Sequence, residues 1–217
     1  DNARKRLAFV ASNTEVEFQS MITLTYPGSF SCDGKVVKRH LYQFLYWLKE
    51  LMPGVNYLWF LEFQRRGAPH FHILLDRQPV HYGGTWPSFQ FSVANTWYNI
   101  VRSRDHKHLL AGTRSERLRT PEGGKHYCVK YAQKMEQKTV PASFWNVGRF
   151  YGYSYAVRPK AKAIVPATWQ QVRAILGDWK YLPDDENDLN KVLFNTSGSV
   201  AIKAVQDAMP ILAFPNL

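Results

Sequence analysis

The chain has 217 residues, 45% of them hydrophobic and 15% aromatic, which is enough apolar material for one folded domain with a substantial core. Lysine and arginine number 28 against 17 acidic residues, so the net charge of +11 favours a polyanionic partner such as nucleic acid, although a basic but uncommitted surface also fits. Two distant cysteines exclude a disulfide framework and a thiolate zinc site, and no apolar run or leader pattern indicates a membrane or secreted protein.

The first 54 residues predict a strand and a helix. A basic lead-in, residues 4–6, is expected to be loose. Residues 21–26 alternate and are rich in β-branched side chains, which is typical of a strand. Residues 35–52 carry apolar side chains at helical spacing, and Pro53-Gly54 ends that helix. The chain starts at Asp1 rather than at Met, which is compatible with a fragment of a longer protein.

A hairpin follows, with strands over residues 55–63 and 69–76 and a turn over 64–68, where Gly67 relieves the backbone. Side chains on a strand share a face at every second residue, so His70 and His72 point the same way. If the turn is symmetric, Glu62 lies opposite His70 on that face.

Two imidazoles and a carboxylate on one patch form a ligand set for a divalent cation. The alternative is that the histidines are ordinary buried polar residues, as a bare His-x-His usually is. Mixed nitrogen and oxygen ligands fit Mg²⁺ or Mn²⁺ paired with a phosphate, or Zn²⁺, and three protein ligands leave an open position for substrate.

The second half predicts a helix over residues 89–101, a solvated turn over 102–108 with a second His-x-His, and a strand over 109–119. That strand has three candidate phosphate contacts: Arg114, Arg117 and Arg119. Further along we expect a helix over 125–138, a last sheet strand within 144–157, and a short helix over 166–176. We expect one domain over residues 1–177 and an acidic C-terminal extension over 178–217.

The helix over 125–138 has an unusual polar face. At about 100° per residue, one side of it presents Tyr127, Lys130, Tyr131, Lys134 and Lys138. Alone, this would be a solvated face with two half-buried phenols. Beside a metal site it suggests nucleophilic chemistry, because nearby cations favour the phenolate and a phenolate can attack a phosphodiester.

Together these residues resemble the HUH endonuclease superfamily, specifically the rolling-circle replication initiators of small phages and plasmids. Residues 69–72, Pro-His-Phe-His, are similar to its His-hydrophobic-His motif, and Glu62 sits where a third metal ligand commonly lies. Residues 127–134 look like its two-tyrosine motif, and the strand with Thr23 and Thr25 resembles its first motif. The resemblance covers about residues 20–157.

The resemblance implies an α+β fold with a central antiparallel sheet of about five strands, flanked by helices. It also implies a Mg²⁺- or Mn²⁺-dependent endonuclease that nicks and rejoins single-stranded DNA at an origin hairpin through a 5′-phosphotyrosine. The metal ligands would be Glu62, His70 and His72. The nucleophile candidates would be Tyr127 and Tyr131, with Lys130 and Lys134 positioning phosphate.

The expected setting is the cytoplasm of a bacterial host, with host replication proteins as candidate further partners. A transposase or conjugative relaxase would use the same chemistry on another DNA target. A non-catalytic single-stranded nucleic-acid binder would instead stack bases on aromatics such as Trp86 and Trp97. A hydrolytic zinc enzyme fits the basic charge least well. No Walker-type motif occurs, so a helicase motor would lie outside this chain.

Overall fold

The structure is a computed structural model that describes residues 2–78, 85–120, 123 and 140–159. Its helices and strands are, in chain order, α1 (Asn2–Asn13), β1 (Ser20–Thr25), α2 (Gly34–Leu51), β2 (Tyr57–Phe63), β3 (Pro69–Leu75), α3 (Trp86–Ile100), α4 (His106–Ala111), β4 (Thr113–Arg117), β5 (Tyr151–Tyr153) and the 3₁₀ turn η3 (Tyr155–Val157). None of the helices among these residues is long and apolar enough to span a membrane.

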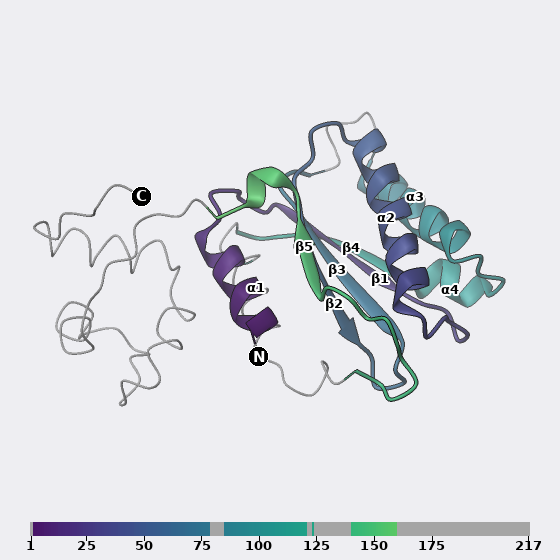
Figure 1. Cartoon of the computed structure of the whole chain (residues 1–217). Helices are drawn as coiled ribbons and strands as arrows, with labels where there is room; N and C mark the ends of the chain where they lie inside the picture. Colours follow the sequence, from purple (N-terminus) through teal and green to yellow (C-terminus); the bar gives the residue numbers. More distant parts are fainter. Residues whose placement is uncertain (1, 79–84, 121–122, 124–139, 160–217) are drawn as a thin grey trace, which may run out of the picture.

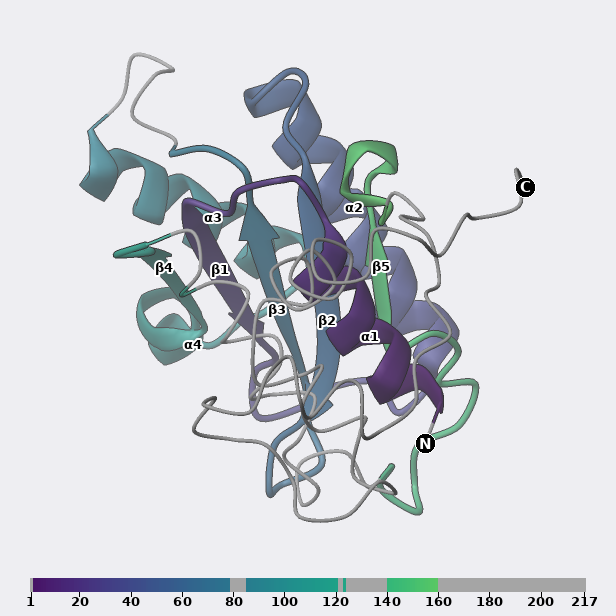
Figure 2. The same cartoon turned by 90° about the vertical axis from the view of Figure 1, so that its left-hand side faces the viewer.

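The strands form one five-stranded sheet in the order β4-β1-β3-β2-β5, with every neighbouring pair antiparallel. Helix α1 lies on one side of the sheet, and α2, α3 and α4 lie on the other (Figures 1 and 2). This confirms the expected α+β class with a central antiparallel sheet flanked by helices. The histidine strand, β3, is the middle strand.

The two faces of the sheet pack against separate clusters. On one face, α2 and α3 cover the inward side chains of β1, β2 and β3, with Leu41, Phe44 and Trp97 fully buried. On the other, Leu7, Val10 and Ala11 of α1 pack over the sheet side chains Met21, Leu58, Phe60 and Leu74. Because β2 and β3 are covered on both faces, they have continuous apolar runs.

The β2–β3 hairpin has the predicted turn and register. The Gln64 carbonyl accepts the Gly67 amide at 2.8 Å, and the Gln64 amide donates to the Ala68 carbonyl at 2.9 Å. Gly67 has φ +78°, in the left-handed region that suits glycine. The resulting register pairs Glu62 with His70, as the symmetric turn predicted.

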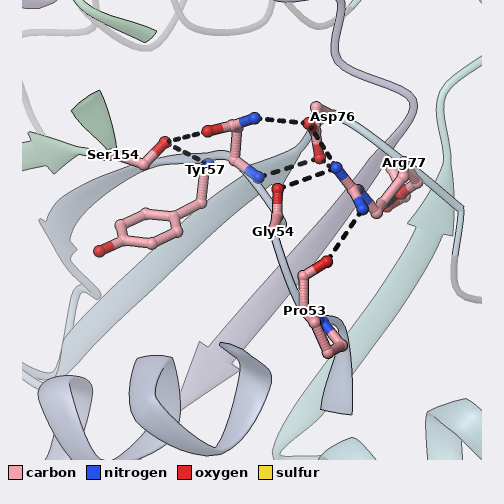
Figure 3. Close-up of polar contacts among 8 residues, drawn as sticks. Pro53, Gly54, Tyr57, Asp76, Arg77 and Ser154 are labelled. Atoms are coloured by element: carbon pink, nitrogen blue, oxygen red, sulfur yellow. Dashed lines mark hydrogen bonds and ion pairs between the residues drawn. The ribbon is translucent and has the colours of Figure 1, made fainter. Parts of the chain in front are cut away.

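The opposite end of the hairpin is held by a polar cluster (Figure 3). The Asp76 carboxylate accepts the backbone and side-chain amides of Asn56 at 3.0 and 2.8 Å, and the Arg77 guanidinium at 2.9 Å. Arg77 also donates to the carbonyls of Pro53 and Gly54. These bonds join the end of β3 to the turn that leads into β2, and so stabilise the hairpin register.

Two expectations for local structure were wrong. The lead-in at residues 4–6 is part of α1, because Leu7, Val10 and Ala11 form an apolar stripe that the sheet buries. The expected solvated turn over 102–108 contains the start of α4, so the strand β4 begins at Thr113 rather than at residue 109. Asp105 caps α4 by accepting the Lys107 amide.

The second histidine of that turn, His108, is buried, with its Nε2 at 2.8 Å from the Thr25 carbonyl oxygen. A Cβ at Gly112 would lie 2.4 Å from the His108 ring, so glycine is needed there. Trp97 is also fully buried and donates its indole N–H to the same carbonyl at 2.7 Å. The expectation that Trp97 stacks nucleic-acid bases was therefore wrong.

Other predicted elements agree in part or lie outside the described residues. The strand expected within 144–157 is the short β5. The tyrosine helix at 125–138, the helix at 166–176 and the extension at 178–217 lie outside the described residues.

Candidate functional site

His70 and His72 lie on the middle strand and share a face. Phe71 and Ile73 point into the cluster beneath α2 and α3, so the histidines point to the α1 side together with Leu74. Their ring centroids are 4.6 Å apart. His72 is buried and stacks on Phe60 at 4.8 Å, whereas His70 is half-buried.

Glu62 joins the histidines from the neighbouring strand. Its Oε2 lies 3.3 Å from His72 Nε2, and both side chains are almost fully buried. Its other oxygen, Oε1, is buried and has no hydrogen-bond partner among the described residues. A buried carboxylate oxygen without a donor is unfavourable, so this atom is suited to a cation or to a bound donor.

Two threonines of β1 hold the other ring nitrogens. Thr23 Oγ1 is 3.2 Å from His72 Nδ1, and Thr25 Oγ1 is 3.0 Å from His70 Nδ1. The antiparallel register places each threonine directly opposite its histidine. Metal-binding histidines typically use one nitrogen for the ion and bond the other to a polar group that fixes the ring.

The sequence connects these threonines with the site only through the family resemblance. The signal that could have found them is the matching alternation, Thr-x-Thr on one strand and His-x-His on another. That match becomes informative once the two strands are known to pair, and the pairing joins residues that are distant along the chain.

The site favours neutral imidazole at His70. Burial lowers the pKa of His70 to about 3, and the positive charges of His72 and Arg66 act in the same direction. Neutral imidazole is the form that donates a lone pair to a metal ion, so the ring is in its ligand form at neutral pH.

The three side chains fit a small divalent ion in part. Two ligands about 2.1 Å from one ion and roughly 90–110° apart are separated by about 3.0–3.4 Å, and the 3.3 Å contact between Glu62 and His72 falls in this interval. Within the described ranges, however, no three His, Cys, Asp or Glu side chains already form a complete metal-binding cluster. Glu62 and His72 are placed as a ligand pair, and His70 is their neighbour on the same face.

Residues 19–136 match the family model for the Replication-associated protein ORF2, and the match covers more than half of the chain. The chain belongs to this family. Searches of curated proteins and of solved structures found no match. The ORF2 family is a family of rolling-circle replication initiators, so the chain is a replication-associated protein with DNA as its expected partner.

The ORF2 family match spans both the histidine strand and the tyrosine segment. Tyr127, Lys130, Tyr131 and Lys134 lie outside the described residues, so their distance from the histidines stays a prediction. Of the arginines expected to contact phosphate, Arg114 pairs with Glu116 at 2.5 Å on β4.

Proposed function

We propose that this ORF2 family protein is a replication initiator endonuclease that nicks and rejoins single-stranded DNA at an origin. The observation that supports the proposal best is the grouping of Glu62, His70 and His72 on one face, with a buried carboxylate oxygen that lacks a partner among the described residues. A set of two imidazoles and one carboxylate suits a divalent ion that also contacts a phosphate.

In this proposal, Glu62 and the Nε2 atoms of both histidines hold a Mg²⁺ or Mn²⁺ ion. Such an ion would supply positive charge to the non-bridging oxygens of the scissile phosphate. The hydroxyls of Thr23 and Thr25 keep the rings oriented through their Nδ1 atoms. The cover provided by Phe60 limits the movement of the His72 ring.

The proposed nucleophile is Tyr127 or Tyr131. Its phenolate oxygen attacks phosphorus, a tyrosine–phosphate bond forms at the 5′ side, and the bond from phosphorus to the 3′ oxygen breaks. The leaving 3′ oxygen takes up a proton, which Lys130 or Lys134 can provide. Attack by a free 3′-hydroxyl on the phosphotyrosine reverses these bond changes and rejoins a strand.

The test is a covalent adduct. The protein is incubated with single-stranded oligonucleotides covering the candidate origin and with Mn²⁺, and the products are run on a denaturing gel. We expect a protein–DNA adduct that EDTA abolishes, that His72→Ala lowers at least about 100-fold, and that Tyr127→Phe/Tyr131→Phe removes. The single tyrosine variants then show which phenol attacks.

The conservative control is Tyr155→Phe, because Tyr155 is an exposed phenol outside the proposed tyrosine segment. Its adduct yield should equal that of the wild type. An adduct that persists in the double tyrosine variant would contradict the proposed nucleophiles. Binding that is salt-dependent but insensitive to EDTA, with no cleavage of any origin strand, would instead favour a non-catalytic binder.

A further inference from the structure

A pocket of about 880 Å³ opens on the face of the sheet opposite to the histidines. Its walls are the loop after β1, the first half of α2 and the end of α3, all on the side where Figure 1 shows α2, α3 and α4. Phe30, Val36 and Ile100 give it an apolar part. Its size is that of a typical small-ligand site.

Two arginines give the pocket a positive charge. Arg39 of α2 and Arg102, just after α3, both line it, and no acidic residue does. Neither guanidinium has an ion pair with any residue that the structure describes. Two unpaired guanidinium groups at one opening are suited to an anion, and their planar donor sets match phosphate.

The backbone at Arg102 supports a role for its side chain. Arg102 has φ +52°, in the left-handed region, at the position after a helix where glycine or asparagine is usual. A residue with a long side chain is strained there. An arginine at this position therefore points to a use for the guanidinium that outweighs the strain.

The floor of the pocket is rigid and offers a hydrogen-bond donor. The Tyr26 hydroxyl lies 3.0 Å from His40 Nδ1, and Tyr26 packs edge-on against Trp97. Burial raises the pKa of the Tyr26 phenol well above its ordinary value and lowers the pKa of His40, with Arg39 and Arg102 lowering it further. With the phenol donating to Nδ1, the neutral His40 ring keeps its hydrogen on Nε2.

An aromatic strip continues from the pocket along α2. Tyr42 and Tyr46 are four residues apart on one helical face and are 57% and 67% exposed. Arg39 and Gln43, which line the pocket, lie beside them on the same helix. Exposed aromatic rings next to a phosphate-binding charge form the pattern that proteins use to stack the bases of single strands.

We propose that the Arg39–Arg102 pocket and the Tyr42–Tyr46 strip form a second DNA-binding site, which takes a single strand on the face away from the histidines. Arg39 and Arg102 hold a backbone phosphate, the apolar wall takes the adjoining nucleotide, and successive bases stack on Tyr42 and Tyr46. This inference rests on the replication role of the family but not on the nicking chemistry.

Fluorescence anisotropy with a labelled oligothymidylate about 20 nucleotides long tests the site, in EDTA so that no cleavage occurs. We expect Arg39→Ala/Arg102→Gly to weaken binding about 10-fold and to lower the slope of log affinity against log salt by about one to two. Glycine at position 102 suits the left-handed backbone, so the variant removes charge without adding strain. Tyr42→Ala/Tyr46→Ala should weaken binding about 10-fold with little change in slope.

The matched controls are Arg104→Ala and Tyr155→Ala. Arg104 is an exposed arginine two residues from Arg102 that does not line the pocket, and Tyr155 is an exposed tyrosine elsewhere. Both should bind like the wild type. Equal losses in the controls and in the pocket variants, or no loss in the pocket variants, would overturn the proposal.

Competition separates the two sources of a nucleotide phosphate. Unlabelled oligothymidylate should displace the labelled strand at micromolar concentration, and thymidine monophosphate should not. Equal displacement by the mononucleotide would make this a free-nucleotide site and would overturn the proposal. Failure of the adduct assay, with pocket variants still impaired in EDTA, would reject the nicking chemistry and leave the second site intact.

Discussion

At the scale of single residues, Glu62 shows how a site can cost stability. Its carboxylate is 2% exposed, and one of its oxygens has no donor among the described residues. An isolated buried carboxylate destabilises a fold unless a cation or a donor compensates for it. A bound ion at this position would therefore contribute both to the chemistry and to the stability.

The buried charge predicts the behaviour of Glu62→Gln. Without metal, the variant should be more stable than the wild type by about 1–2 kcal/mol, because the buried charge is gone. With Mn²⁺, the wild type should gain thermal stability and the variant should not. Thermal unfolding in EDTA and then in Mn²⁺ measures both effects. A variant that Mn²⁺ still stabilises as strongly as the wild type would remove Glu62 from the ligand set.

The threonine behind His70 leads to a second prediction. Thr25→Val keeps the shape of the side chain and removes the hydroxyl that lies 3.0 Å from Nδ1. We expect Mn²⁺ affinity to fall about 10- to 100-fold, because the ring loses its orienting partner. Calorimetric titration with Mn²⁺ measures it.

Two variants serve as controls for this prediction. Thr25→Ser keeps a hydroxyl and should stay within a few-fold of the wild type. Thr113→Val makes the same change on the edge strand β4, away from the histidine rings, and should have no effect. Unchanged Mn²⁺ affinity in Thr25→Val would show that the hydroxyl does not position His70.

At the scale of elements, Lys38 links α2 to the segment before β5. It is a buried lysine that donates to the Val147 carbonyl at 2.9 Å and lies over the rings of Trp59 and Phe71. Burial lowers its pKa from 10.5 to about 8. The contact thus orders the 140–150 segment at the expense of an ammonium group held away from water.

The lowered pKa of Lys38 has a signed consequence for stability. Between pH 8 and pH 10.5 the unfolded chain binds more protons than the folded chain, so the free energy of unfolding should rise with pH. The rise should total roughly 3 kcal/mol at most, relative to Lys38→Met, which lacks the group. Urea unfolding of both proteins across this pH range tests it.

Lys35→Met is the matched control, because Lys35 is an exposed lysine in the first turn of the same helix. Its stability difference from the wild type should not vary over this pH range. A flat difference between wild type and Lys38→Met would mean that Lys38 titrates near its ordinary value when folded.

At the scale of the whole molecule, the sheet separates two candidate sites. The histidines face the α1 side, and the Arg39–Arg102 pocket lies on the side of α2 and α3. Effects of substitutions in separate sites without shared partners are usually additive. A strand that contacts both sides would have to pass around an edge or an end of the sheet.

The separation predicts independent losses. His72→Ala should remove adduct formation while leaving oligonucleotide affinity in EDTA within about two-fold of the wild type. Arg39→Ala/Arg102→Gly should weaken affinity, while adduct formation at saturating DNA stays within a few-fold of the wild type. Measuring both quantities on both proteins and on their combination gives the coupling. A large coupling energy would show that the two faces act as one site.

The sequence by itself was sufficient for the local features of this protein. Alternation and turn chemistry predicted the β2–β3 hairpin, and with it the position of Glu62 opposite His70, because the register of a tight hairpin depends only on the residues in and beside its turn. Helical periodicity likewise predicted α2 and α3 to within a few residues.

The tertiary structure alone decided which distant segments meet. Thr23 and Thr25 lie behind the histidines because β1 pairs with β3, and Arg102 reaches the same pocket as Arg39 because α3 packs against α2. His108 and α1 were misread for the same reason, since each is stabilised by a surface formed elsewhere in the chain. Burial and strand pairing are properties of the assembled fold, so periodicity in one segment does not determine them.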